Sequence, residues 1–251
     1  MTAGEPRPET ATVPPVTAVG EKSLIDHVLV PIDRAGWPFI AAGLCGAVVL
    51  YLLWAPLGWV GLAAAAFCVF FFRDPPRVTP IGPGLIVSPA DGLVAAVEHA
   101  VPPEDLGMGE QPRVRVSVFL SVFDVHINRV PADGTITAVA YRKGKFLNAA
   151  NDKASEDNER QAVRLTTADG RDIAFVQIAG LIARRIRCTL SDGQSVRAGE
   201  RYGLIRFGSR ADIYLPDGVV PLVAPGQRMI GGETVIADLT SEQEPRLGEA
   251  R

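Results

Sequence analysis

The pattern of hydrophobic and polar positions divides the chain into three parts. Residues 1–34 are mostly polar and rich in Pro, Thr, Glu and Ala, a composition typical of disordered tails. Residues 35–72 contain no charged side chain. From residue 73 onward, short apolar runs alternate with residues that form turns. We therefore expect a disordered polar tail (1–34), a hydrophobic segment (35–72) and a folded domain that occupies residues 73–251.

The hydrophobic segment divides around Ala55-Pro56 into two halves, Trp37–Trp54 and Leu57–Phe72. Each half is slightly shorter than the about 20 apolar residues that span a bilayer. Together they predict a helical hairpin that dips into or crosses a membrane and returns. Tryptophans near the ends of the halves fit this prediction, because indole rings favour the membrane interface. The alternative is a helical hairpin buried in a soluble core, but so long an uncharged run is unusual for a surface-packed helix.

Basic residues flank the hydrophobic segment on both sides, with Arg34 before it and Arg73 and Arg77 after it. Lys and Arg are in excess on the cytoplasmic side of membrane segments. A hairpin brings both of its ends to the same side. The charges therefore predict a protein of the cell membrane whose folded domain lies on the cytoplasmic face.

The part after residue 73 has the pattern of short β-strands. In Arg113–Val122, apolar residues occupy every second position. Asp-Gly pairs, which favour tight turns with positive φ, recur at 91–92, 133–134, 169–170, 192–193 and 217–218. We expect a mainly β domain, barrel-like or sandwich-like, with one helical stretch around Lys145–Glu159.

Composition narrows the classes of partner. The formal net charge is −3, and no cluster of Lys and Arg is present, which argues against a nucleic acid as partner. The three cysteines are scattered, and no Cys/His spacing is typical of a zinc site. The sequence therefore predicts neither a disulfide framework nor a metal centre.

A Gly-Ser pair, Gly208-Ser209, lies between two β-like runs. A serine hydroxyl can attack the carbonyl of a preceding glycine, since no side chain shields that carbonyl. The ester that forms can break by elimination and leave a pyruvoyl group on the new N-terminus. In isolation, however, most Gly-Ser pairs are simply turns.

Two further residues are candidates for chemistry. His126 directly follows the strand-like run 113–122, among Asp, Asn and Arg residues, and could serve as a proton donor near neutral pH. The alternative for His126 is a hydrogen-bonded structural histidine. Asp91 lies in Ser88–Gly92, where the local sequence alone indicates a turn aspartate that caps its own backbone.

These pieces resemble the phosphatidylserine decarboxylase family, in its short bacterial and archaeal form. The resemblance covers roughly residues 70–240. Seven segments carry it in consistent order: Phe72–Pro75, Ser88–Gly92, Phe123–Arg129, Lys143–Ala149, Glu156–Arg160, Gln177–Gly180 and Phe207–Ser209. Seven segments in order are far more specific than any one of them.

The resemblance implies a proenzyme that cleaves itself between Gly208 and Ser209. The large chain (1–208) and the small chain (209–251) would then stay associated, and Ser209 would become a covalent pyruvoyl cofactor. The implied reaction converts phosphatidylserine to phosphatidylethanolamine and CO2 in phospholipid biosynthesis, without a metal or diffusible cofactor. A lipid substrate also explains the hydrophobic hairpin, which would hold the catalytic domain at the level of the lipid headgroups.

The resemblance also implies residue roles. Longer members of the family use an Asp-His pair as the base for self-cleavage, and Asp91 matches that aspartate. His126 matches the first of two motif histidines, which is linked to decarboxylation, whereas Arg129 occupies the second position. The base that deprotonates Ser209 therefore stays open between His126, Asp91 and a water. Candidate ligands of the substrate phosphate are Arg73, Lys143, Lys145 and Arg185.

Other interpretations make different use of the same features. A membrane-anchored, lipoyl-like β adaptor would explain the turns in Ser88–Val97 and Gly193–Ile205, but no lysine sits at a clear hairpin tip. A membrane-tethered serine hydrolase would need a Gly-x-Ser-x-Gly elbow, which the sequence lacks. A pyruvoyl enzyme for a soluble amino acid would hardly need the hairpin. The sequence leaves the oligomeric state open, a homo-oligomer included.

Overall fold

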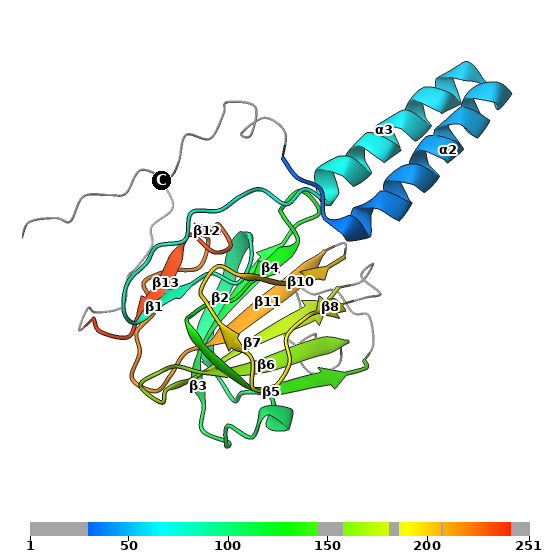
Figure 1. Ribbon diagram of the computed structural model, residues 1–251. Helices are drawn as coiled ribbons and strands as arrows, with labels where there is room; N and C mark the ends of the chain where they lie inside the picture. The colour runs from blue at the N-terminus through cyan, green and yellow to red at the C-terminus, as the bar shows by residue number, and fades with distance from the viewer. Residues whose placement is uncertain (1–29, 145–157, 181–185, 207, 242–251) are drawn as a thin grey trace, which may run out of the picture. The chain divides into compact units, whose positions relative to one another are not determined.

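The computed structural model describes residues 30–144, 158–180, 186–206 and 208–241 (Figure 1). Over these residues the protein is mainly β, with two helices near its N-terminal end, which confirms the predicted fold class. Most of the predicted tail (1–34) and most of the predicted helical stretch (145–159) lie outside the described residues.

The hydrophobic segment forms the predicted hairpin. A 3-10 turn, η1 (Arg34–Gly36), leads into α2 (Trp37–Leu53), and only Trp54 separates α2 from α3 (Ala55–Phe71). The Asp33 side chain caps the first turn by accepting a hydrogen bond from the Ala35 N–H at 2.8 Å. Each helix has 17 residues, a length of about 25 Å at about 1.5 Å per residue.

The two helices pack through small residues. A Cβ on Gly61 would lie 2.7 Å from the Ala47 Cα, and a Cβ on Gly58 would lie 2.5 Å from the Tyr51 Cβ. Such close approach through glycine is typical of helices that associate in lipid. The outward faces are also apolar, with Leu52 and Leu53 more than 70 % exposed. A helix pair that is apolar on all sides needs an apolar environment.

This packing predicts a different response from two glycines of the hairpin. Gly61→Ala is expected to destabilise the hairpin by about 1–3 kcal/mol, because the new methyl group meets the backbone of α2. Gly46→Ala is the matched control, since a Cβ there meets nothing within 4 Å. Thermal unfolding of both variants in detergent measures the difference. Equal melting temperatures would contradict the close packing.

The described part of the β domain contains three sheets. The largest has eight strands in the order β12-β2-β3-β11-β7-β6-β5-β9; a second has the order β4-β10-β8, and β1 pairs with β13. The bounds are β1 (Leu85–Val87), β2 (Gly92–Ala100), β3 (Arg113–Leu120), β4 (Ile127–Arg129), β5 (Gly134–Arg142), β6 (Arg160–Thr166), β7 (Asp172–Ala179), β8 (Ile186–Cys188), β9 (Ser195–Val196), β10 (Arg201–Ile205), β11 (Ser209–Tyr214), β12 (Arg228–Met229) and β13 (Val235–Asp238), with a short 3-10 turn η2 (Glu104–Leu106). The named strand pairs are antiparallel.

Both faces of the large sheet are covered. One face contributes Val116, Val118, Phe175, Ala211 and Ile213 to the main core. The opposite face packs in a second cluster that includes Leu106 and Met108, from the segment around η2. Strand β11 lies in the middle of this sheet, between β3 and β7, and each of its six residues is buried.

Candidate active site

Ser209 is the first residue of β11 and lies opposite Leu120 of β3 and Ala179 of β7. Its side chain is fully buried, and its Oγ has no hydrogen-bond partner among the described residues. Gly208 before it has a φ of +67°, a left-handed conformation that glycine adopts without steric cost. The Gly208-Ser209 bond therefore joins a left-handed residue to a buried strand that carries an unpaired hydroxyl.

His126 is brought to the same region by strand pairing. Ser209 lies opposite Leu120, and the Ile205 N–H donates to the His126 carbonyl at 3.3 Å. Two described contacts therefore link this part of the chain to the segment 120–126, one at Ile205 and one at Ser209. Asp124 folds the intervening loop, because its carboxylate accepts hydrogen bonds from the Ser121 N–H and Oγ. The self-cleavage candidate and the histidine candidate therefore lie on neighbouring segments of the fold.

The hydrogen bonding of His126 defines its protonation. The side chain is fully buried, and its Nδ1 lies 3.0 Å from the Asp124 carbonyl oxygen. A carbonyl only accepts, so Nδ1 carries the hydrogen and Nε2 carries the lone pair. Nε2 has no hydrogen-bond partner among the residues described. Burial lowers the pKa of His126 to about 4, so the imidazole is neutral at neutral pH and its free nitrogen is a proton acceptor.

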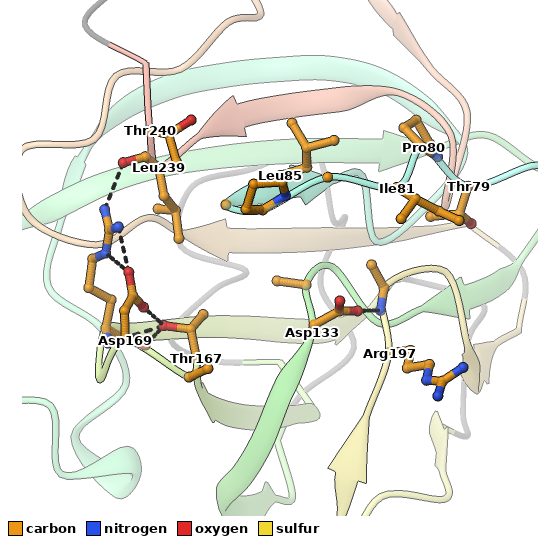
Figure 2. A pocket seen from close by; sticks show the side chains of 17 residues that line it. Thr79, Pro80, Ile81, Leu85, Asp133, Thr167, Asp169, Arg197, Leu239 and Thr240 are labelled. Atoms are coloured by element: carbon orange, nitrogen blue, oxygen red, sulfur yellow. Dashed lines mark hydrogen bonds and ion pairs between the residues drawn. The ribbon is translucent and has the colours of Figure 1, made fainter. Parts of the chain in front are cut away.

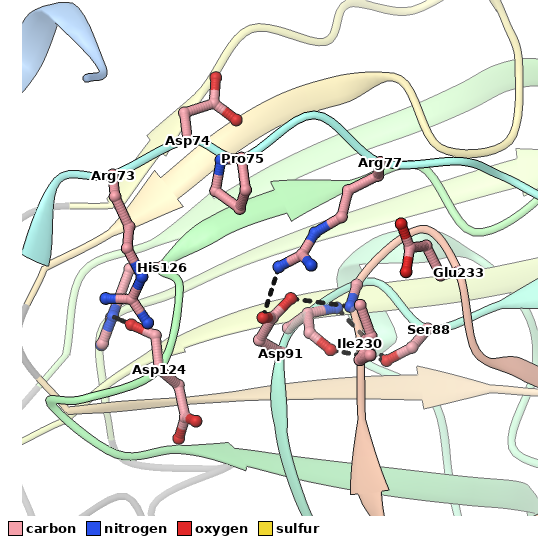
Figure 3. Close-up of polar contacts among 12 residues, drawn as sticks. Arg73, Asp74, Pro75, Arg77, Ser88, Asp91, Asp124, His126, Ile230 and Glu233 are labelled. Atoms are coloured by element: carbon pink, nitrogen blue, oxygen red, sulfur yellow. Dashed lines mark hydrogen bonds and ion pairs between the residues drawn. The ribbon is translucent and has the colours of Figure 1, made fainter. Parts of the chain in front are cut away.

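Asp91 is held by two donors (Figure 3). Its Oδ2 accepts from the Arg77 guanidinium at 2.6 Å, and its Oδ1 accepts from the Gly231 N–H at 2.8 Å. Burial raises the pKa of this carboxyl, and the charge of Arg77 opposes that effect. The Ser209 hydroxyl has no partner among the residues that the structure describes, so neither Asp91 nor His126 is hydrogen-bonded to it in this geometry.

Of the four candidate phosphate ligands, Arg73 lies beside the site. Its Nη2 donates to the Phe123 carbonyl at 2.6 Å and its Nη1 to the Phe70 carbonyl at 2.8 Å. Figure 3 shows it directed toward the loop that carries Asp124 and His126. Lys143 is exposed just after the end of β5. Lys145 and Arg185 lie outside the described residues.

Arg129, at the second motif-histidine position, is a buried structural cation. Its guanidinium donates to the Gly199 carbonyl at 2.9 Å and to the Pro75 carbonyl at 3.0 Å, and it pairs with Asp74 at 3.3 Å. Burial lowers the pKa of Arg129 to about 10, so it still carries its charge at neutral pH. Arg129 therefore links its own strand to the segments around residues 74–75 and 199, and it does not act as a base.

Two buried amides near the site were not singled out from the sequence as functional residues. The Gln177 Nε2 donates to the Asn128 Oδ1 at 2.8 Å and to the Arg187 carbonyl at 3.3 Å, and both amide side chains are fully buried. Gly203 makes room for them, because a Cβ there would lie 2.6 Å from the Gln177 Nε2. The sequence signal that could have identified Gln177 is its position as a polar residue inside the apolar run Phe175–Ala179.

A separate cavity of about 760 Å³ is lined by none of these site residues (Figure 2). Its carboxylates are already paired: Asp133 accepts from the Ala198 N–H at 2.8 Å, and Asp169 pairs with Arg171 at 2.5 Å. The candidate chemistry therefore gathers at the start of β11 and not in this cavity.

Comparison with known proteins identifies the family of the chain. The family model described as phosphatidylserine decarboxylase matches residues 64–237. The phosphatidylserine decarboxylase proenzyme of Paramagnetospirillum magneticum is 60% identical over 229 residues, which cover 91% of this chain and 95% of the relative. The proenzyme of Cereibacter sphaeroides is 58% identical over 91% of this chain and 98% of its own length. The proenzyme of Granulibacter bethesdensis is 60% identical over 86% of this chain and 88% of its own length. The chain belongs to the phosphatidylserine decarboxylase family.

Proposed function

We propose that this protein is a self-cleaving proenzyme that decarboxylates phosphatidylserine to phosphatidylethanolamine and CO2 in phospholipid biosynthesis. The observation that carries the proposal is the buried Ser209 hydroxyl, which has no hydrogen-bond partner among the described residues and follows a left-handed Gly208. Ser209 pairs with Leu120, and six residues later the same segment reaches His126, whose Nε2 has no described partner either. Family membership supports the substrate and the reaction.

In the proposed self-cleavage, the His126 Nε2 takes the proton of the Ser209 hydroxyl, whose oxygen attacks the Gly208 carbonyl carbon. The Gly208–Ser209 C–N bond then breaks as His126 gives this proton to the leaving nitrogen, which leaves an ester to the Ser209 Oγ and a free amine on residue 209. Loss of the Cα proton of residue 209 and cleavage of its Cβ–O bond release the Gly208 carboxylate. Hydrolysis of the remaining enamine releases ammonia and leaves the pyruvoyl group.

The sheet pairing would keep the two product chains together. Strand β11 of the small chain pairs with β3 and β7 of the large chain. Strands β12 and β13, also from the small chain, pair with β2 and β1. The named strands of the small chain thus bond to strands of the large chain, so cleavage between residues 208 and 209 would break no sheet pairing.

The residues at the start of β11 fit a pyruvoyl group. Residue 209 is buried at the end of a strand. Its side-chain oxygen makes no hydrogen bond to the described residues, so loss of this oxygen would break no such bond. The ketone of this group supplies an electron sink for decarboxylation. Because His126 is neutral at rest, its Nε2 can take a proton from the substrate ammonium and later return it to the substrate α-carbon.

We further propose that the hairpin holds the domain at the cytoplasmic face of the cell membrane. The helix with its preceding turn, Arg34–Leu53, is long and apolar enough to cross a membrane. A phospholipid with two acyl chains stays in the bilayer, so its headgroup has to be met at the membrane surface. Arg73 directly follows the hairpin, and we assign the contact with the substrate phosphate to it.

The proposal is tested by the intact mass of the purified protein, with Ser209→Ala as the control. We expect two polypeptides that divide between Gly208 and Ser209, with a pyruvoyl N-terminus on the smaller one, and CO2 release from phosphatidylserine in mixed micelles. Ser209→Ala is expected to stay uncut and inactive. A folded wild-type chain that stays uncut would refute self-cleavage and favour the lipoyl-like adaptor. Cleavage with CO2 release from a free amino acid, but not from the lipid, would refute the substrate.

A further inference from the structure

The base of the hairpin is built into the β domain. The Asp33 N–H donates to the Phe72 carbonyl at 2.8 Å, and the Asp74 N–H donates to the Pro31 carbonyl at 2.7 Å. Phe71 and Phe72 are fully buried in one cluster with Val125, Ile127 and Leu204. The end of α3 and the residues around His126 therefore share a single hydrophobic cluster.

Within this cluster, Phe71 covers the His126 ring. The two ring centroids are 4.3 Å apart, with an interplanar angle of 37°, and both side chains are fully buried. One turn earlier, Phe67 meets the Phe123 ring edge-on at 6.3 Å. The last turns of α3 thus contact the loop 121–126 both near its middle and at its catalytic end.

Among the described residues, few other polar contacts restrain the imidazole. One hydrogen bond, from Nδ1 to the Asp124 carbonyl, holds one edge of the ring, and Nε2 has no partner among the described residues. A single hydrogen bond leaves the ring free to tilt about that contact. The Phe71 ring packs against the imidazole and restrains its remaining orientation, and the imidazole is fully buried.

We propose that Phe71 is a positioning residue for His126, so that the membrane hairpin forms one wall of the catalytic site as well as an anchor. This inference rests on the proposed function of His126. The Phe71 ring holds the imidazole plane and excludes water, which keeps the imidazole neutral and its Nε2 directed for proton transfer. Loss of the Phe71 ring therefore changes both the rate of self-cleavage and its dependence on pH.

The charged groups around the imidazole come from several segments. Asp124 lies on its own loop and is paired with Arg228 of β12. Arg73, after α3, acts on both His126 and Asp91, and Asp91 is paired with Arg77. Arg206, after β10, lies over the Phe39 ring at 5.1 Å. Phe71 is uncharged, so replacing it leaves each of these charges in the chain and changes only the packing and hydration of the ring.

The test compares Phe71→Leu and Phe71→Ala in the full-length chain, with the rate of self-cleavage followed in detergent after rapid synthesis. We expect cleavage about 10-fold slower for Leu and about 100-fold slower for Ala, because small misplacements of a catalytic group are costly. Water beside the ring also lets it protonate more easily. The ratio of the rates at pH 5.5 and pH 8 should therefore fall from near 1 in the wild type to below about one half.

Val69→Ala is the control, since this residue of the same helix end is partly exposed and its rate and pH profile should not change. Slowing that is equal at every pH, or no slowing in Phe71→Leu, would overturn the inference. Phe71→Leu keeps an apolar side chain and covers the case in which the Ala variant fails to fold. His126→Ala separates the two claims: normal cleavage in that variant would refute the role of His126 as the base, on which this inference rests.

Discussion

Replacement of His126 with alanine is expected to leave almost all of the protein uncut, with self-cleavage slowed at least about 100-fold. A positioned acid–base side chain contributes roughly 10²–10⁴ to a rate. Among the residues around Gly208-Ser209, His126 combines full burial with a nitrogen whose lone pair is unengaged. The measurement is the fraction of cleaved chain against time, by intact mass or gel.

The exposed His99 provides the matched control, and His99→Ala should cleave at the wild-type rate. The dependence of the self-cleavage rate on pH gives a second test of His126 as the base. Because the neutral imidazole is the base and its pKa is lowered to about 4, the wild-type rate should stay level from pH 8 to about 5 and fall only as the pH approaches 4. A rate that survives in His126→Ala but is lost in Asp91→Asn would instead assign the base to Asp91.

Local patterns predicted the hairpin and the strands well. The predicted halves Trp37–Trp54 and Leu57–Phe72 became α2 and α3, which end at Leu53 and Phe71. The second helix begins earlier than predicted, at Ala55, because a proline is tolerated in the first turn of a helix. The hairpin was predictable because its signal, a long uncharged run interrupted at Ala55-Pro56, lies within the local sequence.

The Asp-Gly pairs show where such local reasoning fails. Gly170, Gly193 and Gly218 have the positive φ that the tight-turn prediction requires. Gly134 does not have a positive φ; instead it starts β5, where a Cβ would lie 2.5 Å from the Thr166 carbonyl oxygen. Glycine is needed there for the close approach of β6, and no local pattern distinguishes that need from a turn.

The site was predictable only in part, for a similar reason. Ser209 and His126 could be named from motifs, but the contact of His126 with Phe71 joins residues 55 positions apart in the sequence. Arg129 could be seen only as a departure from a two-histidine motif. Its three partners, at residues 74, 75 and 199, come from distant segments, so its structural role needed the fold.

Removal of the Arg129 side chain is expected to be among the most destabilising single changes outside the reacting groups. Arg129→Ala should lower the free energy of unfolding by about 3 kcal/mol, because it removes a buried cation from its pair with Asp74 and leaves the Gly199 and Pro75 carbonyl groups without their donor. The Arg129 side chain is 6% exposed and the Asp74 side chain 13% exposed, so both groups lie largely out of water. Denaturant unfolding of the uncut Ser209→Ala chain in detergent gives the value without interference from cleavage.

Arg201 is the matched control, because it pairs with the same Asp74 at 2.6 Å but its side chain is 49% exposed. Arg201→Ala should cost less than about 1 kcal/mol, and high salt should remove that cost, as for other surface ion pairs. Arg129→His, which installs the histidine of longer family members, should be destabilised and cleave no faster than the wild type. Faster cleavage in that variant would mean that a histidine at position 129 can reach Ser209. Position 129 would then be a candidate for the base that deprotonates Ser209.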